Sequence, residues 1–155
     1  MKGDSPVNIF FFTESTKYVV RNKTAIRDWL KRCAKSENVR VGELNFIFCS
    51  DQYLRKINKQ YLNHKTLTDV ITFDSSEEPT VIEGDIFISI ERVQSNAKEL
   101  SQTEDEELHR VIIHGVLHLL GYTDKTKSGQ ILMRKKEDAY LSLRKIGRAS
   151  CRERV

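Results

Sequence analysis

The chain has 155 residues, of which 39% are hydrophobic and 31% are charged, and its formal net charge at pH 7 is +4. This length suits a single domain with its own core, and the composition excludes a disordered or collagen-like chain. No apolar run reaches the roughly 18 residues that a membrane-spanning helix needs, so the sequence predicts no membrane span.

The last residues, 147–155, differ from the rest of the chain. They hold three arginines, one glutamate and no apolar periodicity, so half of the net charge of +4 lies there. We expect one domain over 1–146 and an expression-derived or disordered tail over 147–155. The three cysteines, Cys33, Cys49 and Cys151, form no CxxC pair, which indicates free thiols in a reducing compartment, with Cys33 and Cys49 in the core.

The first two thirds of the chain are predicted to mix strands and helices. Clustered or alternating β-branched and aromatic residues predict strands at 7–13, 44–49, 68–73 and 81–90. Apolar residues at helical spacing predict helices at 24–35, from Ser50 or Asp51 onward, and at 90–100.

The last third is predicted to be helical. Thr103 and Glu106 form a capping box for a helix that ends at Gly121. A final helix is expected from Ser128 to about residue 147, with an inward face made of Ile131, Leu132, Tyr140 and Leu143. This order of elements indicates an α+β fold, in which about five helices pack on a small mixed sheet of about four strands.

The segment His114-Gly-Val-Leu-His118 carries the candidate chemistry. In a helix, two side chains four residues apart project about 40° apart around the axis and about 6 Å apart along it, so both imidazoles can reach one ion. Gly121 lets the chain double back, and Asp124 lies just beyond, where it can supply a third ligand. Two histidines, a carboxylate and an open position are typical of a catalytic metal site. The alternative is a pair of packed histidines in an apolar helix.

Gly115 separates this zincin-like metal helix from ordinary metalloproteases. In the H-E-x-x-H pattern a glutamate follows the first histidine as general base, and Gly115 has no side chain to accept a proton. Glycine inside a helix costs about 1 kcal/mol relative to alanine, so we expect it to clear space for a close neighbour or a substrate, or to allow tight packing against another helix. His109 points away from the pair and is expected at the surface or in helix packing.

Residues 114–122, HGVLHLLGY, resemble the signature of the YbeY family, bacterial endoribonucleases that take part in ribosomal RNA maturation. The resemblance covers roughly residues 7–147, and its further segments are Leu67 to Phe73 (LTDVITF) preceded by Asn58 and Tyr61, Gly84-Asp85-Ile86, and Met133 with Glu137. It implies a metal-dependent hydrolase of single-stranded RNA, with a mixed sheet and helices around one metal ion that is usually zinc.

Two positions depart from the family pattern. The family's metal histidines fall on His114 and His118, but its third falls on Asp124. A carboxylate removes one positive charge from the site, so Zn²⁺ is the first expectation and Mn²⁺ or Fe²⁺ become more competitive. The family arginine after the tyrosine is replaced by Leu62, and the candidates to contact phosphate in its place are His64 and Lys65, just downstream.

The resemblance and the residues together suggest a mechanism. We expect the ion held by His114, His118 and Asp124 either to activate a water as the nucleophile or to assist attack by the RNA 2′-hydroxyl. Asp85 is a candidate to hydrogen-bond a ligand histidine, with a plain turn residue as the alternative. Lys125 and Lys127 flank Asp124 and are candidates to guide the RNA backbone.

The resemblance also implies a biological setting. It implies maturation of the 16S rRNA 3′ end and ribosome quality control in the cytoplasm, with ribosomal RNA and the small ribosomal subunit as partners. We expect a monomer with no membrane partner and no disulfide-linked partner. Two alternatives stay open: a zincin-like peptidase or amide hydrolase, and a non-catalytic ribosome-assembly factor whose metal is structural.

Overall fold

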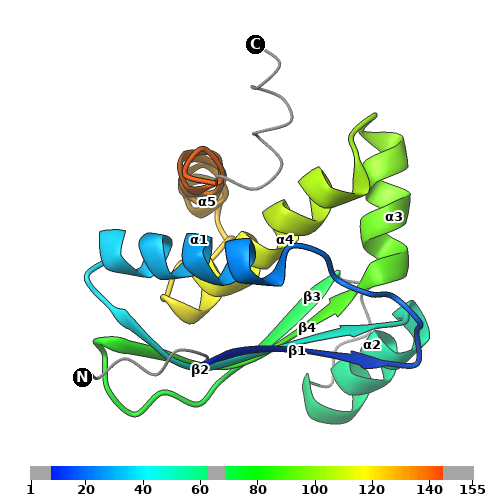
Figure 1. Cartoon of the computed structure of the whole chain (residues 1–155), viewed down its shortest axis with the longest axis horizontal. Coiled ribbons are helices and arrows are strands. Elements are labelled where there is room, and N and C mark those ends of the chain that lie inside the picture. Colours follow the sequence, from blue (N-terminus) through cyan, green and yellow to red (C-terminus); the bar gives the residue numbers. More distant parts are fainter. Residues whose placement is uncertain (1–7, 63–68, 145–155) are drawn as a thin grey trace.

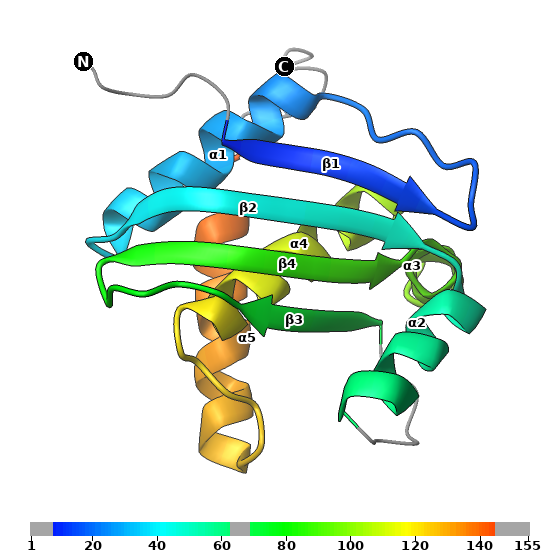
Figure 2. The ribbon, with the colours of Figure 1, turned by 90° about the horizontal axis from the view of Figure 1, so that it is seen from below.

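A computed structural model describes residues 8–62 and 69–144 of the chain. Its described residues form a sheet with the strand order β1-β2-β4-β3. The three parallel strands are β1 (Ile9–Glu14), β2 (Arg40–Cys49) and β4 (Val81–Ser89), and β3 (Val70–Asp74) lies antiparallel to β4 at one edge (Figure 2). The prediction of a small mixed sheet is therefore confirmed.

The helices are divided between the two faces of the sheet (Figure 1). On one side lie α1 (Lys23–Ser36), α4 (Glu104–Leu119) and α5 (Lys127–Leu141), and α3 (Ile90–Glu99) stands beside the beginning of α4. On the other side lies α2 (Asp51–Ile57), which continues into the short π-helix η1 (Asn58–Leu62). This arrangement confirms the α+β class.

Side chains alternate across the sheet, as the period of a strand requires. Phe46, Phe48, Ile86 and Ile88 are fully buried in the larger core cluster, which also contains the inward faces of α1, α4 and α5. Phe87 points the other way and packs on the smaller cluster beneath α2. The alternation therefore fixes which face of the sheet receives α4, the helix with the two histidines.

Hydroxyl side chains cap four of the helices. Thr103 Oγ1 accepts a hydrogen bond from the backbone N–H of Glu106 at 3.1 Å, so the predicted beginning of α4 is confirmed. The same type of hydrogen bond, from a backbone N–H to a side-chain hydroxyl, caps α2, α3 and α5 at Ser50, Ser89 and Thr126. Each cap satisfies a backbone donor that the helix itself leaves unpaired.

The prediction for the last helix is partly wrong. α5 ends at Leu141, and three residues that we expected inward are exposed: Ile131 at 61%, Leu132 at 44% and Leu143 at 37%. Tyr140 is buried as predicted, and the rest of the buried stripe of α5 consists of Met133, Glu137 and Leu141. The reason is that the charged Glu137 takes an inward position, because it is paired there with side chains of α4.

The two cysteines in the described residues confirm their prediction. Cys33 and Cys49 are free thiols in the core, and burial raises the pKa of each thiol to about 12. Cys151 and the expected tail over 147–155 lie outside the described residues.

None of the helices in the described part of the chain combines the length and the apolar character of a membrane span.

Candidate metal centre

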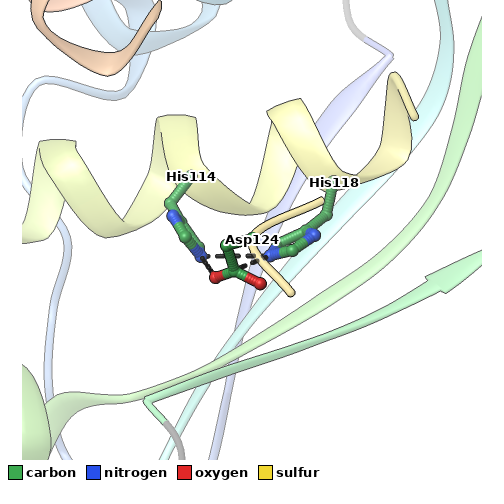
Figure 3. Close-up of side chains that lie close together, drawn as sticks. All are labelled: His114, His118 and Asp124. Atoms are coloured by element: carbon green, nitrogen blue, oxygen red, sulfur yellow. Dashed lines mark hydrogen bonds and ion pairs between the residues drawn. The ribbon is translucent and has the colours of Figure 1, made fainter. Parts of the chain in front are cut away.

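Helix α4 presents both predicted histidines on one face (Figure 3). The Nε2 atoms of His114 and His118 face each other at 3.0 Å, and the two ring centroids lie 4.6 Å apart. Both side chains are about three-quarters buried, so each keeps one edge open to solvent. The spacing of four residues therefore brings the two imidazoles to one point, as the sequence predicts.

A tight turn after α4 returns the chain toward these histidines. Gly121 has a φ of 106°, in the left-handed region that favours glycine. Its N–H donates to the carbonyl of His118 at 3.0 Å, and the N–H of Tyr122 donates to the carbonyl of Leu117 at 3.0 Å. This pair of hydrogen bonds is a Schellman motif, which ends the helix and reverses the chain.

The turn places the Asp124 carboxylate between the two rings (Figure 3). Asp124 Oδ2 lies 3.5 Å from His114 Nε2 and 3.8 Å from His118 Nε2. A tetrahedral ion with ligand bonds of about 2.0–2.1 Å separates neighbouring ligand atoms by about 3.3 Å. The three observed separations bracket this value, and the three atoms lie within 4.8 Å of one another. The donor set therefore fits one divalent cation with an open position.

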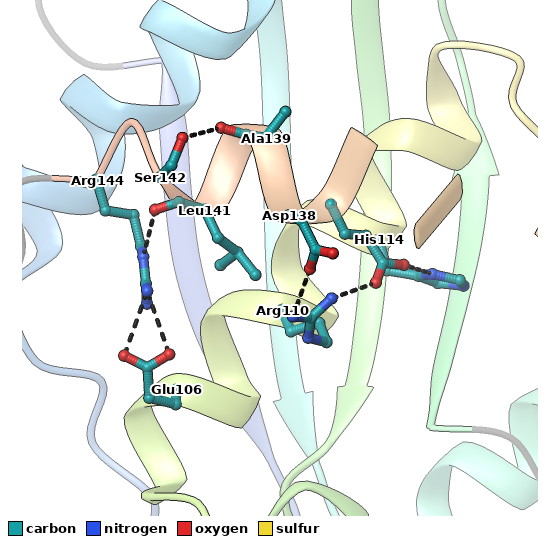
Figure 4. Close-up of polar contacts among 9 residues, drawn as sticks. Glu106, Arg110, His114, Asp138, Ala139, Leu141, Ser142 and Arg144 are labelled. Carbon is teal, nitrogen blue, oxygen red and sulfur yellow. Dashed lines mark hydrogen bonds and ion pairs between the residues drawn. The ribbon is translucent and has the colours of Figure 1, made fainter. Parts of the chain in front are cut away.

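A buried carboxylate fixes the orientation of the His114 ring. His114 Nδ1 lies 2.6 Å from Glu137 Oε2, and the other oxygen of Glu137 accepts a hydrogen bond from Arg110 at 2.9 Å. Arg110 also donates to Asp138 at 2.8 Å, so it joins α4 to α5 (Figure 4). A carboxylate on the far nitrogen keeps the proton there and leaves Nε2 free to bind a metal.

The charges in this network favour the protonation states that a metal site needs. Burial would raise the pKa of Glu137, but its hydrogen bonds with His114 and Arg110 hold it below the ordinary value. Burial and the neighbouring His114 lower the pKa of His118. Burial would also lower the pKa of His114, but Glu137 raises it above the ordinary value. Glu137 is thus ionised and His118 neutral near pH 7.

A second polar network holds the turn that carries Asp124. Tyr122 and Lys136 donate hydrogen bonds to the Glu37 carboxylate at 2.9 and 3.1 Å, and Tyr140 donates a third. Burial alone would raise the pKa of Glu37, but these donors hold it below its ordinary value. The network ties the turn to the end of α1 and to α5, which limits the positions that Asp124 can take.

Gly115 allows α4 to lie close to the sheet. A Cβ atom at this position would lie 2.8 Å from Ile86 Cγ2 and 3.4 Å from Val70 Cγ2. The close neighbour is therefore the sheet, and the expected alternatives of a substrate or another helix are not what the structure places there. A side chain at position 115 would point into the core, so this position supplies no general base.

His109 has the packing role that the sequence allowed. It is 3% exposed, its ring centroid lies 5.7 Å from that of Trp29, and its Nδ1 contacts Arg144 at 2.9 Å. Burial, aided by the Arg144 charge, lowers its pKa to about 4. His109 is therefore a neutral core residue on the far side of α4 from the metal centre.

A cavity of about 430 Å³ adjoins the metal centre. Its lining includes His114, Asp124, Asp69, Glu107 and Arg134. This volume is within the range of about 300–1,000 Å³ that is usual for small-molecule sites. The metal centre thus adjoins a space that a substrate can fill.

Comparison with known proteins identifies the family. Residues 10–145 match the family model described as Endoribonuclease YbeY. The chain belongs to the YbeY family.

Relatives in this family match the chain over nearly its whole length. It is 56% identical over 138 residues to Endoribonuclease YbeY of Cytophaga hutchinsonii, which covers 89% of this chain and 96% of the relative. It is 49% identical over 139 residues to Endoribonuclease YbeY of Amoebophilus asiaticus, with 90% and 95% covered. The solution structure of TM1509 from Thermotoga maritima has a similar fold, with a TM-score of 0.61, 28% identity and 87% of each chain covered.

Within this YbeY-family chain, Asp85 does not lie at the histidines. Asp85 lies on the face of β4 opposite to that of Ile86, and its Oδ1 accepts a hydrogen bond from Asn45 at 3.0 Å. The position that we expected for Asp85 is taken by Glu137. The sequence signal for Glu137 is that it belongs, together with Met133, to a segment that resembles the family, but this resemblance assigns it no role.

The remaining predicted site residues concern RNA contacts. Lys125 and Lys127 are exposed and follow Asp124 directly, with Lys127 at the beginning of α5. Their position beside the metal centre agrees with the expected cationic rim, and an RNA contact stays a prediction. His64 and Lys65 lie outside the described residues.

Proposed function

We propose that this YbeY-family chain is a metal-dependent endoribonuclease that cleaves single-stranded RNA at His114, His118 and Asp124. The observation that carries the proposal is the convergence of two imidazole nitrogens and a carboxylate oxygen within 4.8 Å, beside a cavity of about 430 Å³. Its family relatives are named endoribonucleases, which supports the same reaction class.

The residues of the chain divide the work around one ion. His114, His118 and Asp124 would hold it, and a divalent ion in such a site supplies Lewis acidity that lowers the pKa of water and neutralises phosphate charge. Glu137 keeps a proton on Nδ1 of His114, so that Nε2 faces the ion. Tyr122, anchored by Glu37, keeps the turn in place before Asp124.

The identity of the ion follows from the chemistry of the ligands. Two imidazoles suit Zn²⁺, which we propose as the resident ion. Asp124 stands where the family signature has a histidine, and an oxygen ligand makes Mn²⁺ and Fe²⁺ stronger competitors. The Asp124 carboxylate would also lower the net charge of the loaded site, so the ion would acidify water less than it would with a third histidine.

The proposed substrate is ribosomal RNA, with cleavage at the 3′ end of 16S rRNA and a role in ribosome quality control on the small subunit in the cytoplasm. Lys125 and Lys127 would contact the RNA backbone as it enters the site. We propose that the chain acts as a monomer through one domain over 1–146, and that 147–155 is a tail without a part in catalysis.

Matched aspartate variants test this function. Purified wild-type protein, Asp124→Asn and Asp138→Asn are incubated with Zn²⁺ and a labelled single-stranded RNA or its duplex. We expect the wild-type protein and Asp138→Asn to cut the single strand and not the duplex, and Asp124→Asn to lose at least about 100-fold in rate, as the loss of transition-state charge stabilisation predicts. Equal rates for the wild-type protein and Asp124→Asn would refute the proposal.

The ends of the products identify the nucleophile. A 2′,3′-cyclic phosphate would show attack by the RNA 2′-hydroxyl, and a product formed directly with a linear phosphate would show attack by water. Casein in the same assay tests the peptidase alternative, and peptide cleavage that His118→Ala abolishes would favour it.

A further inference from the structure

Glu107 lies on the same stripe of α4 as the metal ligands. Glu107, Val111, His114 and His118 are spaced by four, three and four residues, so they share one face of the helix. Glu107 and His114 are seven positions apart in the helix, which is about 10 Å along the axis. Both side chains line the same cavity. Glu107 therefore stands at one end of this cavity, and the metal centre stands at another.

The Glu107 carboxylate is buried and incompletely paired. The residue is 5% exposed, and its Oε1 atom has no hydrogen-bond partner among the described residues. Burial raises its pKa, and so do the negative charges of Asp69 and Glu137, while Arg110 and Arg134 act in the opposite direction. A buried acceptor without a partner destabilises the fold, so its presence in the wall of a cavity points to a ligand that supplies a donor.

A role for Glu107 in the stability of the helix end does not explain its burial. Three other acidic residues occupy the first turn of α4, namely Glu104, Asp105 and Glu106, and they interact with the helix dipole from positions that are exposed or partly exposed. Glu107 alone in this turn faces the cavity.

The walls around Glu107 suit a flat heteroaromatic ring. Leu100, Val111 and Met133 contribute apolar surface to the cavity, and Arg134 contributes a cation at its wall. Proteins stack the unpaired bases of single-stranded RNA on aromatic rings or on guanidinium planes, and Arg134 can offer such a plane beside the apolar side chains. The Glu107 carboxylate supplies a hydrogen-bond acceptor for the edge of the ring, and Asp69 is a second carboxylate in the lining.

We propose that this end of the cavity is a subsite for one base of the RNA next to the cleaved phosphate, and that Glu107 selects guanine there. The inference rests on the proposed function of the metal centre. Guanine presents two adjacent donors, N1–H and the N2 amino group, which a single carboxylate can accept. Uracil presents one N–H between two carbonyl oxygens, and a carboxylate repels both of these oxygens. Adenine and cytosine each offer one amino donor beside a ring-nitrogen acceptor and rank between the two.

Binding of mononucleotides tests the subsite without any cleavage. Guanosine, inosine and uridine 5′-monophosphates are titrated by calorimetry into the Zn²⁺-loaded full chain, and into Glu107→Gln and Glu104→Gln. Glu104→Gln is the matched control, because it removes an exposed carboxylate from the same helical turn. A mononucleotide has no internal phosphodiester, so failure of the endoribonuclease proposal and failure of this inference have separate readouts.

The expected affinities differ between the nucleotides and between the two variants. The wild-type protein and Glu104→Gln bind the guanosine nucleotide about tenfold more tightly than the uridine nucleotide, as one bidentate base contact provides. The inosine nucleotide, which lacks the N2 amino group, lies between them. Glu107→Gln keeps its fold by circular dichroism and a Tm at least equal to that of the wild-type protein, and its preference falls to about twofold or less, because the charged acceptor is gone.

Two results would overturn the inference. One is equal affinity of the wild-type protein for the guanosine and uridine nucleotides, which needs no variant to measure. The other is an unchanged guanine preference in Glu107→Gln, whether or not its Tm falls, since a carboxylate that only supports the fold would give that outcome.

Discussion

Glu137 provides the sharpest test of how the metal centre is built. Its carboxylate lies 2.6 Å from His114 Nδ1, and its side chain is 8% exposed. Substitution Glu137→Gln keeps the shape and removes the charge that orients the His114 ring. Loss of such a partner typically weakens metal binding about 10–100-fold. At about 1.4 kcal/mol for each tenfold change, this is about 1.4–2.8 kcal/mol of binding free energy.

A competition assay measures the change. Metal-free wild-type and variant proteins compete with a chromophoric chelator for Zn²⁺ at pH 7, and circular dichroism verifies that each protein is folded. Asp138→Asn is the matched control, because Asp138 accepts from the same Arg110 but is 59% exposed and has no contact with His114. We expect Asp138→Asn to bind Zn²⁺ within about twofold of the wild-type protein, as a solvent-exposed ion pair is worth little.

Two results would refute this reasoning. Unchanged Zn²⁺ affinity in Glu137→Gln would show that Glu137 does not orient the ligand. An equal loss in Asp138→Asn would show that the effect comes from Arg110 and not from the contact with His114.

Three further changes follow from the packing and the charges. Gly115→Ala should lower the free energy of unfolding by up to about 2 kcal/mol in urea titrations, because overpacking against Ile86 costs about 1–3 kcal/mol and the gain in helix propensity returns about 1 kcal/mol. A higher free energy of unfolding would contradict the close approach. Glu37→Gln should lower stability by about 1–3 kcal/mol at pH 7. The folded pKa of Glu37 lies below its ordinary value of 4.5, so the loss of stability caused by Glu37→Gln should be complete above pH 4.5 and should shrink as the pH falls through the folded pKa. Equal losses of stability in thermal melts at pH 7 and pH 3 would contradict this prediction. Cys33 and Cys49 should resist iodoacetamide at pH 8 in the native protein and react in guanidinium, because burial raises the pKa of each thiol to about 12. Peptide mass spectrometry measures the labelling, and rapid labelling in the native state would argue against their burial.

The parts of the fold that depend on local signals were predictable from the sequence. Alternation placed Phe46 and Phe48 on the buried face of β2, and the Thr103 cap together with Gly121 fixed both ends of α4. With its ends fixed, the helical period put the two histidines on one face, and the glycine turn made Asp124 the natural third ligand.

The parts that depend on long-range pairing were not predictable. β2 begins at Arg40 and not at residue 44, because its early residues pair with Val81 and Ile82 of β4 across an irregularity in register. The inward position of Glu137 was missed because a charged residue on a helix indicates a solvent face when its partner, Arg110 on another helix, is unknown. Without knowledge of that pairing, the apolar Ile131 is the better candidate for the inward face of the helix.

The metal content of the purified protein is the most direct test of the central claim that His114, His118 and Asp124 hold one divalent ion. Wild-type protein, Asp124→Ala and the control Asp138→Ala are loaded with Zn²⁺, desalted and analysed by mass spectrometry of the metal. The account predicts about one equivalent in the wild-type protein and in Asp138→Ala, and a small fraction of one in Asp124→Ala, because a three-ligand site that loses its only carboxylate loses most of its affinity. Equal metal content in all three proteins would contradict it.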